Sequence, residues 1–253
     1  MKKLFFVLLF VPLTKLYSQN ISDEKKDYDI IFKKISNSGK WGVNDKKGTV
    51  NYIDNDKILS SLKIPEKGKS VSLSFDISLD STQVNYSKYD ELTQYDHQAS
   101  PVEHNGYDWA TDEYKISYHG FTVSHMDGLA HLGENGKLYN DFDASKITSQ
   151  GFEEIGVENY KEGIITKGVL IDIPLLYRKD FLKAGTKITI QDIERFEKKY
   201  NVKIEKGDVV LVRTGRWKEK IKNGDWDTSK LSTGLNYRVA ILLSERKVSV
   251  LGS

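Results

Sequence analysis

A strand, a helix and a second strand follow one another between residues 168 and 212, and this order constrains the fold more than any other feature of the sequence. The segments Gly168 to Ile173 and Val209 to Val212 are predicted as apolar strands of the buried kind. Between them, a helix is predicted to begin at Thr189 or Gln191 and to run to Tyr200. Two strands joined through a helix form a parallel crossover unit. The sequence therefore predicts an α/β protein.

Hydrophobic periodicity predicts further elements on both sides of this unit. They are helices at residues 20–40, 54–62 and 237–246, and strands at residues 65–79 and 248–251. In the second of these helices Asp54 is the expected N-cap, and Ile58 and Leu62 are expected to face inward. The strand at 65–79 alternates apolar and polar residues, so one of its faces is expected to be exposed.

Residues 80–112 show no clear periodicity and scatter tyrosines and Trp109 among polar residues. Two interpretations of this segment have equal weight. A long aromatic-rich loop in an enzyme is often a binding segment or a lid. The other interpretation is a surface excursion whose aromatic side chains only cover the fold.

Residues 1–18 have the pattern of a cleaved secretory signal: a basic start, an apolar run too short to span a bilayer, and a small residue, Ser18, before Gln19. The alternative is an N-terminal anchor that is retained. Cleavage would leave residues 19–253 as one domain and would place the mature protein in the periplasm or outside the cell.

Composition excludes several classes of function. The chain has no cysteine, which excludes disulfides, thiolate metal sites and cysteine nucleophiles. Loss of the three lysines in residues 1–18 changes the formal net charge from +2 to −1. A nearly neutral protein gives no reason to expect a nucleic-acid partner, or a membrane partner after cleavage. A small-molecule substrate is the expected partner.

The stretch Tyr118 to Asn140 contains three of the five histidines, and their spacing favours a common site. His125 and Asp127 would share one face of an extended segment, because they are two residues apart. Asp127 and His131 would share one face of a helix, because they are four apart. A strand that runs into a helix would therefore gather two imidazoles and a carboxylate, a ligand set suited to zinc, manganese or iron(II).

A structural role is the alternative for each of these residues taken singly. A lone histidine is more often hydrogen-bonded or exposed than a metal ligand, and an aspartate before glycine often only forms a turn. The clustering of the histidines in one short stretch favours a site over this alternative.

The run from Phe121 to His131 resembles the signature H-x-G-T-H-x-D-x-P-x-H of the cyclase family of metal-dependent amide hydrolases, which includes bacterial kynurenine formamidase and isatin hydrolase. His125, Asp127 and His131 match in register, whereas Phe121 stands where the signature has its first histidine. His119 lies two residues earlier, as in a longer branch of the family with the pattern H-G-Y-A-T-T-H-x-D-A-x-x-H.

Three further blocks resemble that longer branch in the same order along the chain. They are Trp41 to Asn51, Lys167 to Asp172 and Gly207 to Gly215. The resemblance implies a single-domain α/β fold of the kynurenine formamidase type, a swivelling β/β/α arrangement with a mixed sheet and flanking helices. It also implies a homo-oligomer, with a dimer expected.

The resemblance further implies roles for the clustered residues. His125 and Asp127, with His119 as the candidate third ligand, would bind a divalent metal, with zinc first and manganese second. His131 would act as general acid and base. The reaction implied is hydrolysis of an amide, or of a cyclic amide or ester. Trp109, Phe121 and Arg213 are the candidate substrate contacts, Arg213 because ligand sites of α/β sheets lie at the carboxyl ends of strands.

Two other classes of function stay open at this point. One is a secreted binding protein with the same fold and no catalysis, which Phe121 in place of a ligand favours. The other is a carbohydrate-associated domain that uses Tyr and Trp platforms. Family members of the longer branch continue beyond a matching L-G-S with further site residues, so the chain that ends at Ser253 is expected to lack its C-terminal part.

Overall fold

A three-stranded parallel sheet lies in the hydrophobic core of the protein, in a computed structural model that describes residues 13–77, 94–104, 106–121, 123–152 and 154–253. Its strands are β3 (Gly168–Asp172), β5 (Val209–Arg213) and β7 (Val250–Gly252), in the order β3-β5-β7. Gly168 pairs with Val209, and Val209 pairs with Val250, in parallel register. The predicted crossover unit and the α/β class are therefore confirmed.

Two helices contribute apolar side chains to the core at this sheet. Helix α4 (Ile190–Tyr200) buries Ile193 and Phe196, and α6 (Val239–Glu245) buries Val239, Leu242 and Leu243. These side chains belong to one core cluster with Val169, Ile171, Val210 and Val212 of the sheet. Helix α4 begins at a capping box, in which Thr189 and Asp192 each accept the backbone N–H of the other.

The buried character predicted for both faces of the first strand is wrong. Val169 and Ile171 are buried, but Leu170 is 55% exposed. Leu170 points to the opposite face of the strand from these two residues, so only one face of β3 packs on the core.

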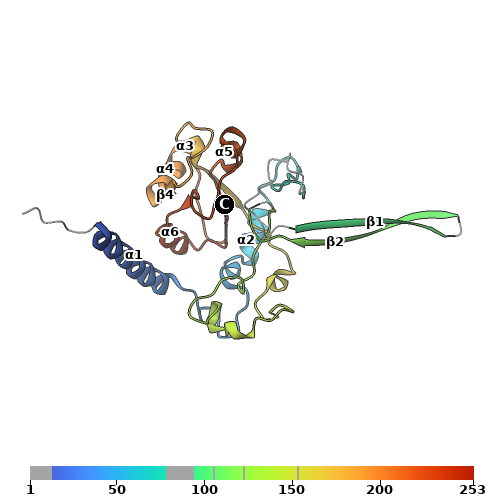
Figure 1. Ribbon diagram of the computed structural model, residues 1–253, viewed down its shortest axis with the longest axis horizontal. Coiled ribbons are helices and arrows are strands. Elements are labelled where there is room, and N and C mark those ends of the chain that lie inside the picture. Colours follow the sequence, from blue (N-terminus) through green and yellow to red (C-terminus); the bar gives the residue numbers. More distant parts are fainter. Residues whose placement is uncertain (1–12, 78–93, 105, 122, 153) are drawn as a thin grey trace, which may run out of the picture.

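The remaining elements are short, apart from α1 and one hairpin (Figure 1). The helices are α1 (Leu13–Ile35), α2 (Asn55–Ser61), α3 (Ile173–Leu176) and α5 (Arg216–Asn223), and the 3-10 turns are η1 (Gly48–Tyr52), η2 (Tyr139–Asp141), η3 (Ala144–Lys146) and η4 (Val157–Tyr160). Strands β4 (Lys187–Ile188) and β6 (Gly234–Leu235) form a separate parallel pair. The third sheet is an antiparallel hairpin of β1 (Gln94–His104) and β2 (Tyr107–Ser117).

The N-terminal helix and α2 differ in detail from the prediction. Helix α1 begins at Leu13 and so extends across the predicted cleavage position, while residues 1–12 lie outside the described part. No helix among the described residues is both long and apolar enough to cross a membrane. In α2, Asp54 is the N-cap as predicted and accepts the N–H of Lys57 at 2.9 Å. Leu62 is 57% exposed, because the helix ends at Ser61.

The strand predicted at 65–79 is wrong for residues 65–77, and residues 78 and 79 lie outside the described part. Alternation alone does not make a strand, since the backbone also needs a neighbouring strand to bond with. No strand lies beside this segment among the described residues. The side chain of Phe75 instead packs edge-on against Trp217 of α5, with ring centroids 5.6 Å apart.

The long irregular loop predicted at 80–112 is also wrong where it is described. Residues 94–104 and 107–117 pair over eleven positions, and the hairpin extends away from the rest of the molecule (Figure 1). Gly106 has φ 77° in the connection, a conformation that tight hairpin turns require. The other part of the predicted loop, residues 80–93, lies outside the described residues.

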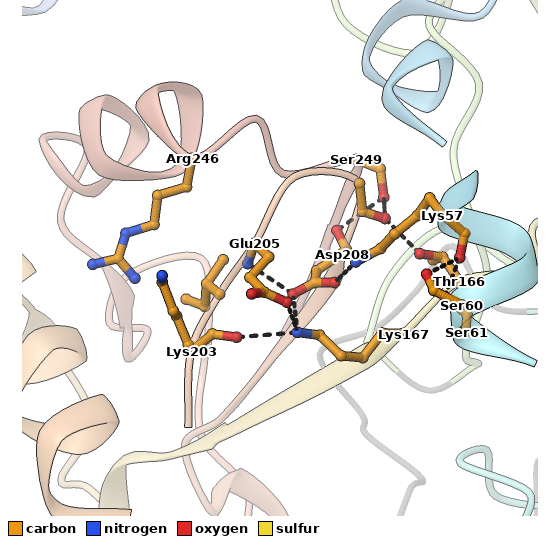
Figure 2. A network of polar contacts seen from close by, with 12 residues as sticks. Lys57, Ser60, Ser61, Thr166, Lys167, Lys203, Glu205, Asp208, Arg246 and Ser249 are labelled. Atoms are coloured by element: carbon orange, nitrogen blue, oxygen red, sulfur yellow. Dashed lines mark hydrogen bonds and ion pairs between the residues drawn. The ribbon is translucent and has the colours of Figure 1, made fainter. Parts of the chain in front are cut away.

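A buried carboxylate joins α2 to the sheet at the start of β5 (Figure 2). Asp208 is fully buried and forms ion pairs with Lys57 of α2 and with Lys167, whose Nζ lies 3.1 Å from Asp208 Oδ2. The N–H of Glu205 also donates to Oδ2 at 2.8 Å. The hydroxyl of Ser249 donates to the carbonyl of Asp208 at 2.9 Å. This network therefore connects segments that are distant in sequence.

The block from Trp41 to Asn51 serves the fold through Asp45. Its carboxylate accepts hydrogen bonds from Asn51 at 2.6 Å, from the Gly48 N–H at 2.9 Å and from the Tyr139 hydroxyl at 2.7 Å. Burial by itself would raise the pKa of Asp45, but these hydrogen bonds, led by that of Tyr139, outweigh it and lower the pKa.

Replacement of Asp45 by Asn is expected to destabilise the protein at pH 7 by about 1–3 kcal/mol, since hydrogen bonds to a charged group are lost. The pKa of Asp45 is lowered in the folded state, so its stabilisation is present above the unfolded pKa of about 4 and is lost as the pH falls below it. Urea unfolding at pH 7 and at pH 3 should therefore show the difference between wild type and Asp45→Asn shrinking on acidification.

The Tyr139→Phe substitution provides the internal control. It should cost less in the Asp45→Asn background than in wild type, because the two groups share one hydrogen bond. Equal costs in both backgrounds, or a difference that does not change with pH, would contradict the role given to Asp45.

Candidate metal centre

An irregular loop, rather than a strand that runs into a helix, carries the clustered histidines. No helix or strand is present at residues 118–121 or 123–131. The loop is closed by a hydrogen bond from the His131 N–H to the Gly128 carbonyl at 3.0 Å, and it is tied to the segment before η4 by the Ala130 N–H, which donates to the Ile155 carbonyl at 3.1 Å. The expectation about local structure is wrong, yet the predicted convergence of the side chains is observed.

Close packing at Gly128 sets the path of this loop. A Cβ atom at position 128 would lie 2.9 Å from the carbonyl carbon of Gly156 and 2.9 Å from the amide nitrogen of Val157. Both neighbours are backbone atoms, so a larger residue would push the two segments apart. Glycine at 128 therefore brings Asp127 and the segment 156–158 to one place.

Three imidazoles surround one oxygen of Asp127. The distances to Asp127 Oδ1 are 3.3 Å from His119 Nδ1, 3.7 Å from His125 Nε2 and 3.7 Å from His131 Nδ1. The rings of His119 and His131 are stacked with centroids 4.6 Å apart, and the ring of His125 lies edge-on to His119 at 5.4 Å. The structure thus brings together all four residues that the sequence singled out.

The donor atoms fit a divalent metal. One atom from each of His119, Asp127 and His131 lies within 4.8 Å of the others. His119 Nδ1 is shielded from solvent and makes no hydrogen bond among the described residues, so a cation would satisfy a nitrogen that is otherwise unsatisfied. Imidazole nitrogen with carboxylate oxygen is the donor set of zinc and manganese sites rather than of calcium sites.

His125 differs from the other two histidines in its second nitrogen. Its Nδ1 lies 2.8 Å from the Val123 carbonyl, a distance at which Nδ1 carries the proton and donates it to the oxygen. The lone pair is then on Nε2, the nitrogen that faces Asp127. A histidine that ligates a metal commonly donates its other N–H to a carbonyl in this way. The side chain of His125 is also the least exposed of the three, at 19%.

Two clefts meet at the cluster. A polar cleft of about 520 Å³ is lined by His119, Asp127 and His131 together with Gln150, Phe152 and Glu158. A second cleft of about 550 Å³ is mainly apolar and is lined by Ile116, Val123, Met126 and Tyr160 together with His125. Tyr118 and Val157 line both clefts, so they separate the two spaces.

Glu158 is a cleft residue that the sequence did not single out. Its Oε1 accepts the Gly156 N–H at 3.1 Å and the Asn159 side-chain amide at 3.1 Å. A Cβ at Gly156 would lie 2.2 Å from Glu158 Oε2, so glycine makes room for the carboxylate. The only signal in the sequence was a glycine two residues before a glutamate, which is too common a pattern to identify a site.

The three candidate substrate contacts lie outside the lining of both clefts. The guanidinium of Arg213 forms two hydrogen bonds to Asp172 on the paired strand, at 2.8 and 2.9 Å, and one to the Asp180 carbonyl at 3.2 Å. Trp109 lies in the exposed part of β2 and is 46% exposed. Phe121 packs against Arg216 of α5. Their predicted contact with substrate stays a prediction.

The fold and the clustered site define an α/β protein of the cyclase type. The structure is similar to a crystal structure described as that of a novel cyclase, with a TM-score of 0.74 and 24% identity over 87% of this chain and 74% of the other. A family model described as "Putative cyclase" matches residues 70–253. The chain therefore belongs to the cyclase family, which confirms the resemblance seen in its motifs. No match is found among curated proteins.

Proposed function

We propose that the protein is a metal-dependent hydrolase that cleaves C–N or C–O bonds of amides, or of cyclic amides or esters. The observation that carries the proposal is the arrangement of three imidazoles around one oxygen of Asp127, at 3.3–3.7 Å. Membership of the cyclase family supports a hydrolase or cyclase role in general terms. The proposal adds the metal and the bond that is cleaved.

In this proposal His119, His125 and Asp127 hold the metal, with zinc as the first expectation and manganese as the second. A divalent metal in such a site polarises a carbonyl and lowers the pKa of a water molecule. The hydrogen bond between His125 Nδ1 and the Val123 carbonyl supports His125 as a ligand, because it fixes the ring and leaves Nε2 toward Asp127. The unsatisfied Nδ1 supports the same role for His119.

His131 is proposed as the general acid and base. Its side chain is 47% exposed and lies in the polar cleft, so it can exchange a proton with solvent. Imidazole is the side chain that ordinarily exchanges a proton near neutral pH. In amide hydrolysis this group would accept a proton from the attacking water and deliver a proton to the leaving nitrogen. One donor atom of His131 also lies within 4.8 Å of donor atoms of His119 and Asp127, which is the geometry of a metal ligand. The metal content of His131→Ala distinguishes a ligand from a general acid and base.

The two clefts indicate how a substrate would divide between them. The reacting carbonyl belongs in the polar cleft, beside His131, and the apolar part of the molecule belongs in the cleft lined by Ile116, Met126 and Tyr160. Apolar walls with a few convergent polar groups are typical of small-molecule sites.

Metal analysis and a substrate screen test the proposal. About one or two equivalents of zinc or manganese per chain are expected, with hydrolysis of N-formyl aromatic amines or of cyclic amides that stops on chelation. His131→Ala should retain the metal and lose turnover, whereas His125→Ala should lose both. Absence of tightly bound metal after supplementation with zinc and manganese would overturn the proposal.

One observation favours a second function, a binding protein that keeps the fold without catalysis. Phe121 occupies the position of the first histidine of the family signature, so the ligand set depends on His119. A protein that binds a small ligand in the apolar cleft with no metal and no turnover would fit this alternative.

A further inference from the structure

The guanidinium of Arg216 contacts an aromatic cluster beside the metal loop. Its Cζ lies 4.2 Å from the centroid of the Phe121 ring, 5.2 Å from that of Trp217 and 5.6 Å from that of Trp226. All three distances are within the range of cation–π attraction, and the shortest is to the ring in the loop. Arg216 therefore connects the loop of residues 118–131 to helix α5.

Helix α5 is a firm support for such a contact. Glu219, one turn after Arg216, is 5% exposed, and its carboxylate accepts the Ala184 N–H at 3.0 Å. Gly215, immediately before the helix, has φ 81° and packs so closely that a Cβ would lie 2.6 Å from the Asp180 carbonyl oxygen. The side chain at position 216 thus projects from backbone that is held by Gly215 before it and by Glu219 after it.

The segment of the loop around His119 lacks the regular structure of α5. It lacks helix and strand at residues 118–121 and 123–131, and its side chains are substantially exposed, with Phe121 at 52% and the His119 side chain at 45%. Gly120, between these two residues, has φ 130°, so the chain turns sharply between the ring and the imidazole. Phe121 is therefore close enough along the chain for its packing to influence where the His119 imidazole lies.

We propose that Arg216 is a positioning residue for the metal centre, and that Phe121 serves as the attachment point of the loop. This inference rests on the proposed function only for its consequence on metal affinity. In the family signature the position of Phe121 is occupied by a histidine. In this chain an aromatic ring replaces that histidine and fixes the loop through Arg216, while His119 supplies the nitrogen two residues earlier.

Hydrogen exchange of the metal-free protein tests the attachment directly. Arg216→Met keeps an unbranched, flexible side chain and removes the guanidinium and its charge, so amides of residues 118–128 should exchange about 3- to 30-fold faster. Arg216→Lys keeps a cation over the ring and should restore slow exchange. Arg195→Met is the matched control, because Arg195 of α4 lies 5.5 Å from the ring of Tyr177, and its replacement should leave exchange at residues 118–128 unchanged.

Zinc affinity, measured by chelator competition, tests the consequence. Arg216→Met should weaken zinc binding by about 3- to 30-fold, and Arg216→Lys should bind nearly as wild type. Phe121→Leu should resemble Arg216→Met, and the cost of the double variant should be less than the sum of the two single costs, because both substitutions remove the contact between Arg216 and Phe121.

The outcomes separate this inference from the proposed function. Unchanged exchange in both Arg216→Met and Phe121→Leu would overturn the inference, even if the protein binds zinc and hydrolyses amides. Absence of both zinc and manganese binding by the wild type would overturn the proposed function, while the exchange experiment would still decide whether Arg216 holds the loop.

Discussion

Replacing Asp127 with alanine is expected to abolish metal binding and hydrolysis. Asp127 Oδ1 is the atom around which the three imidazoles gather, so its removal takes away the proposed oxygen ligand and the negative charge that would balance the charge of the metal. Loss of an outer partner of a metal ligand already costs about 10- to 100-fold, so loss of this carboxylate should lower kcat/KM by more than ~100-fold. Metal content per chain and initial rates measure both effects.

Glu134→Ala is the matched control for this experiment. Glu134 is an exposed carboxylate in the same segment, three residues after His131, and it lies outside the lining of both clefts. Its removal should leave metal content and rate close to those of wild type. If Asp127→Ala keeps a full equivalent of metal, the site assigned to this loop is wrong.

Replacing Asp208 with asparagine should cause the largest loss of stability. The carboxylate is fully buried between Lys57 and Lys167, whose side chains are only 13% and 24% exposed. Asparagine has nearly the size of aspartate, but its neutral amide cannot balance the charges of the two ammonium groups. Its NH₂ group would also face one of them. Breaking a buried ion pair by removing one partner costs about 3–5 kcal/mol. The melting temperature should fall by roughly 6–20 °C in a chain of this length.

The same substitution at Asp54 serves as the comparison. Asp54 also pairs with a lysine, at 2.6 Å from Lys206 Nζ, but both side chains are about half exposed. Asparagine can still cap α2, because it is as good an N-cap as aspartate. Asp54→Asn should therefore melt close to wild type. If Asp208→Asn melts at the same temperature as Asp54→Asn, burial does not increase the contribution of Asp208 to stability.

The sequence determined the elements whose signals are local. The period of Ile193 and Phe196 and the cap at Thr189 predicted α4, and the apolar segments on either side predicted two parallel strands, because caps and periodicity act within one or two turns of chain. It also indicated which residues could form a metal site, since His125, Asp127 and His131 stand out by type and spacing, and the family resemblance adds His119.

Only the tertiary structure decided how those residues meet. The loop reaches Asp127 without the helix that the spacing suggested, because Gly128 packs on the backbone of Gly156. Arg213, at the expected end of β5, pairs with Asp172, whereas Arg216 contacts Phe121. Contacts between segments far apart in sequence depend on the packing of the whole chain, and no local pattern of residues encodes them.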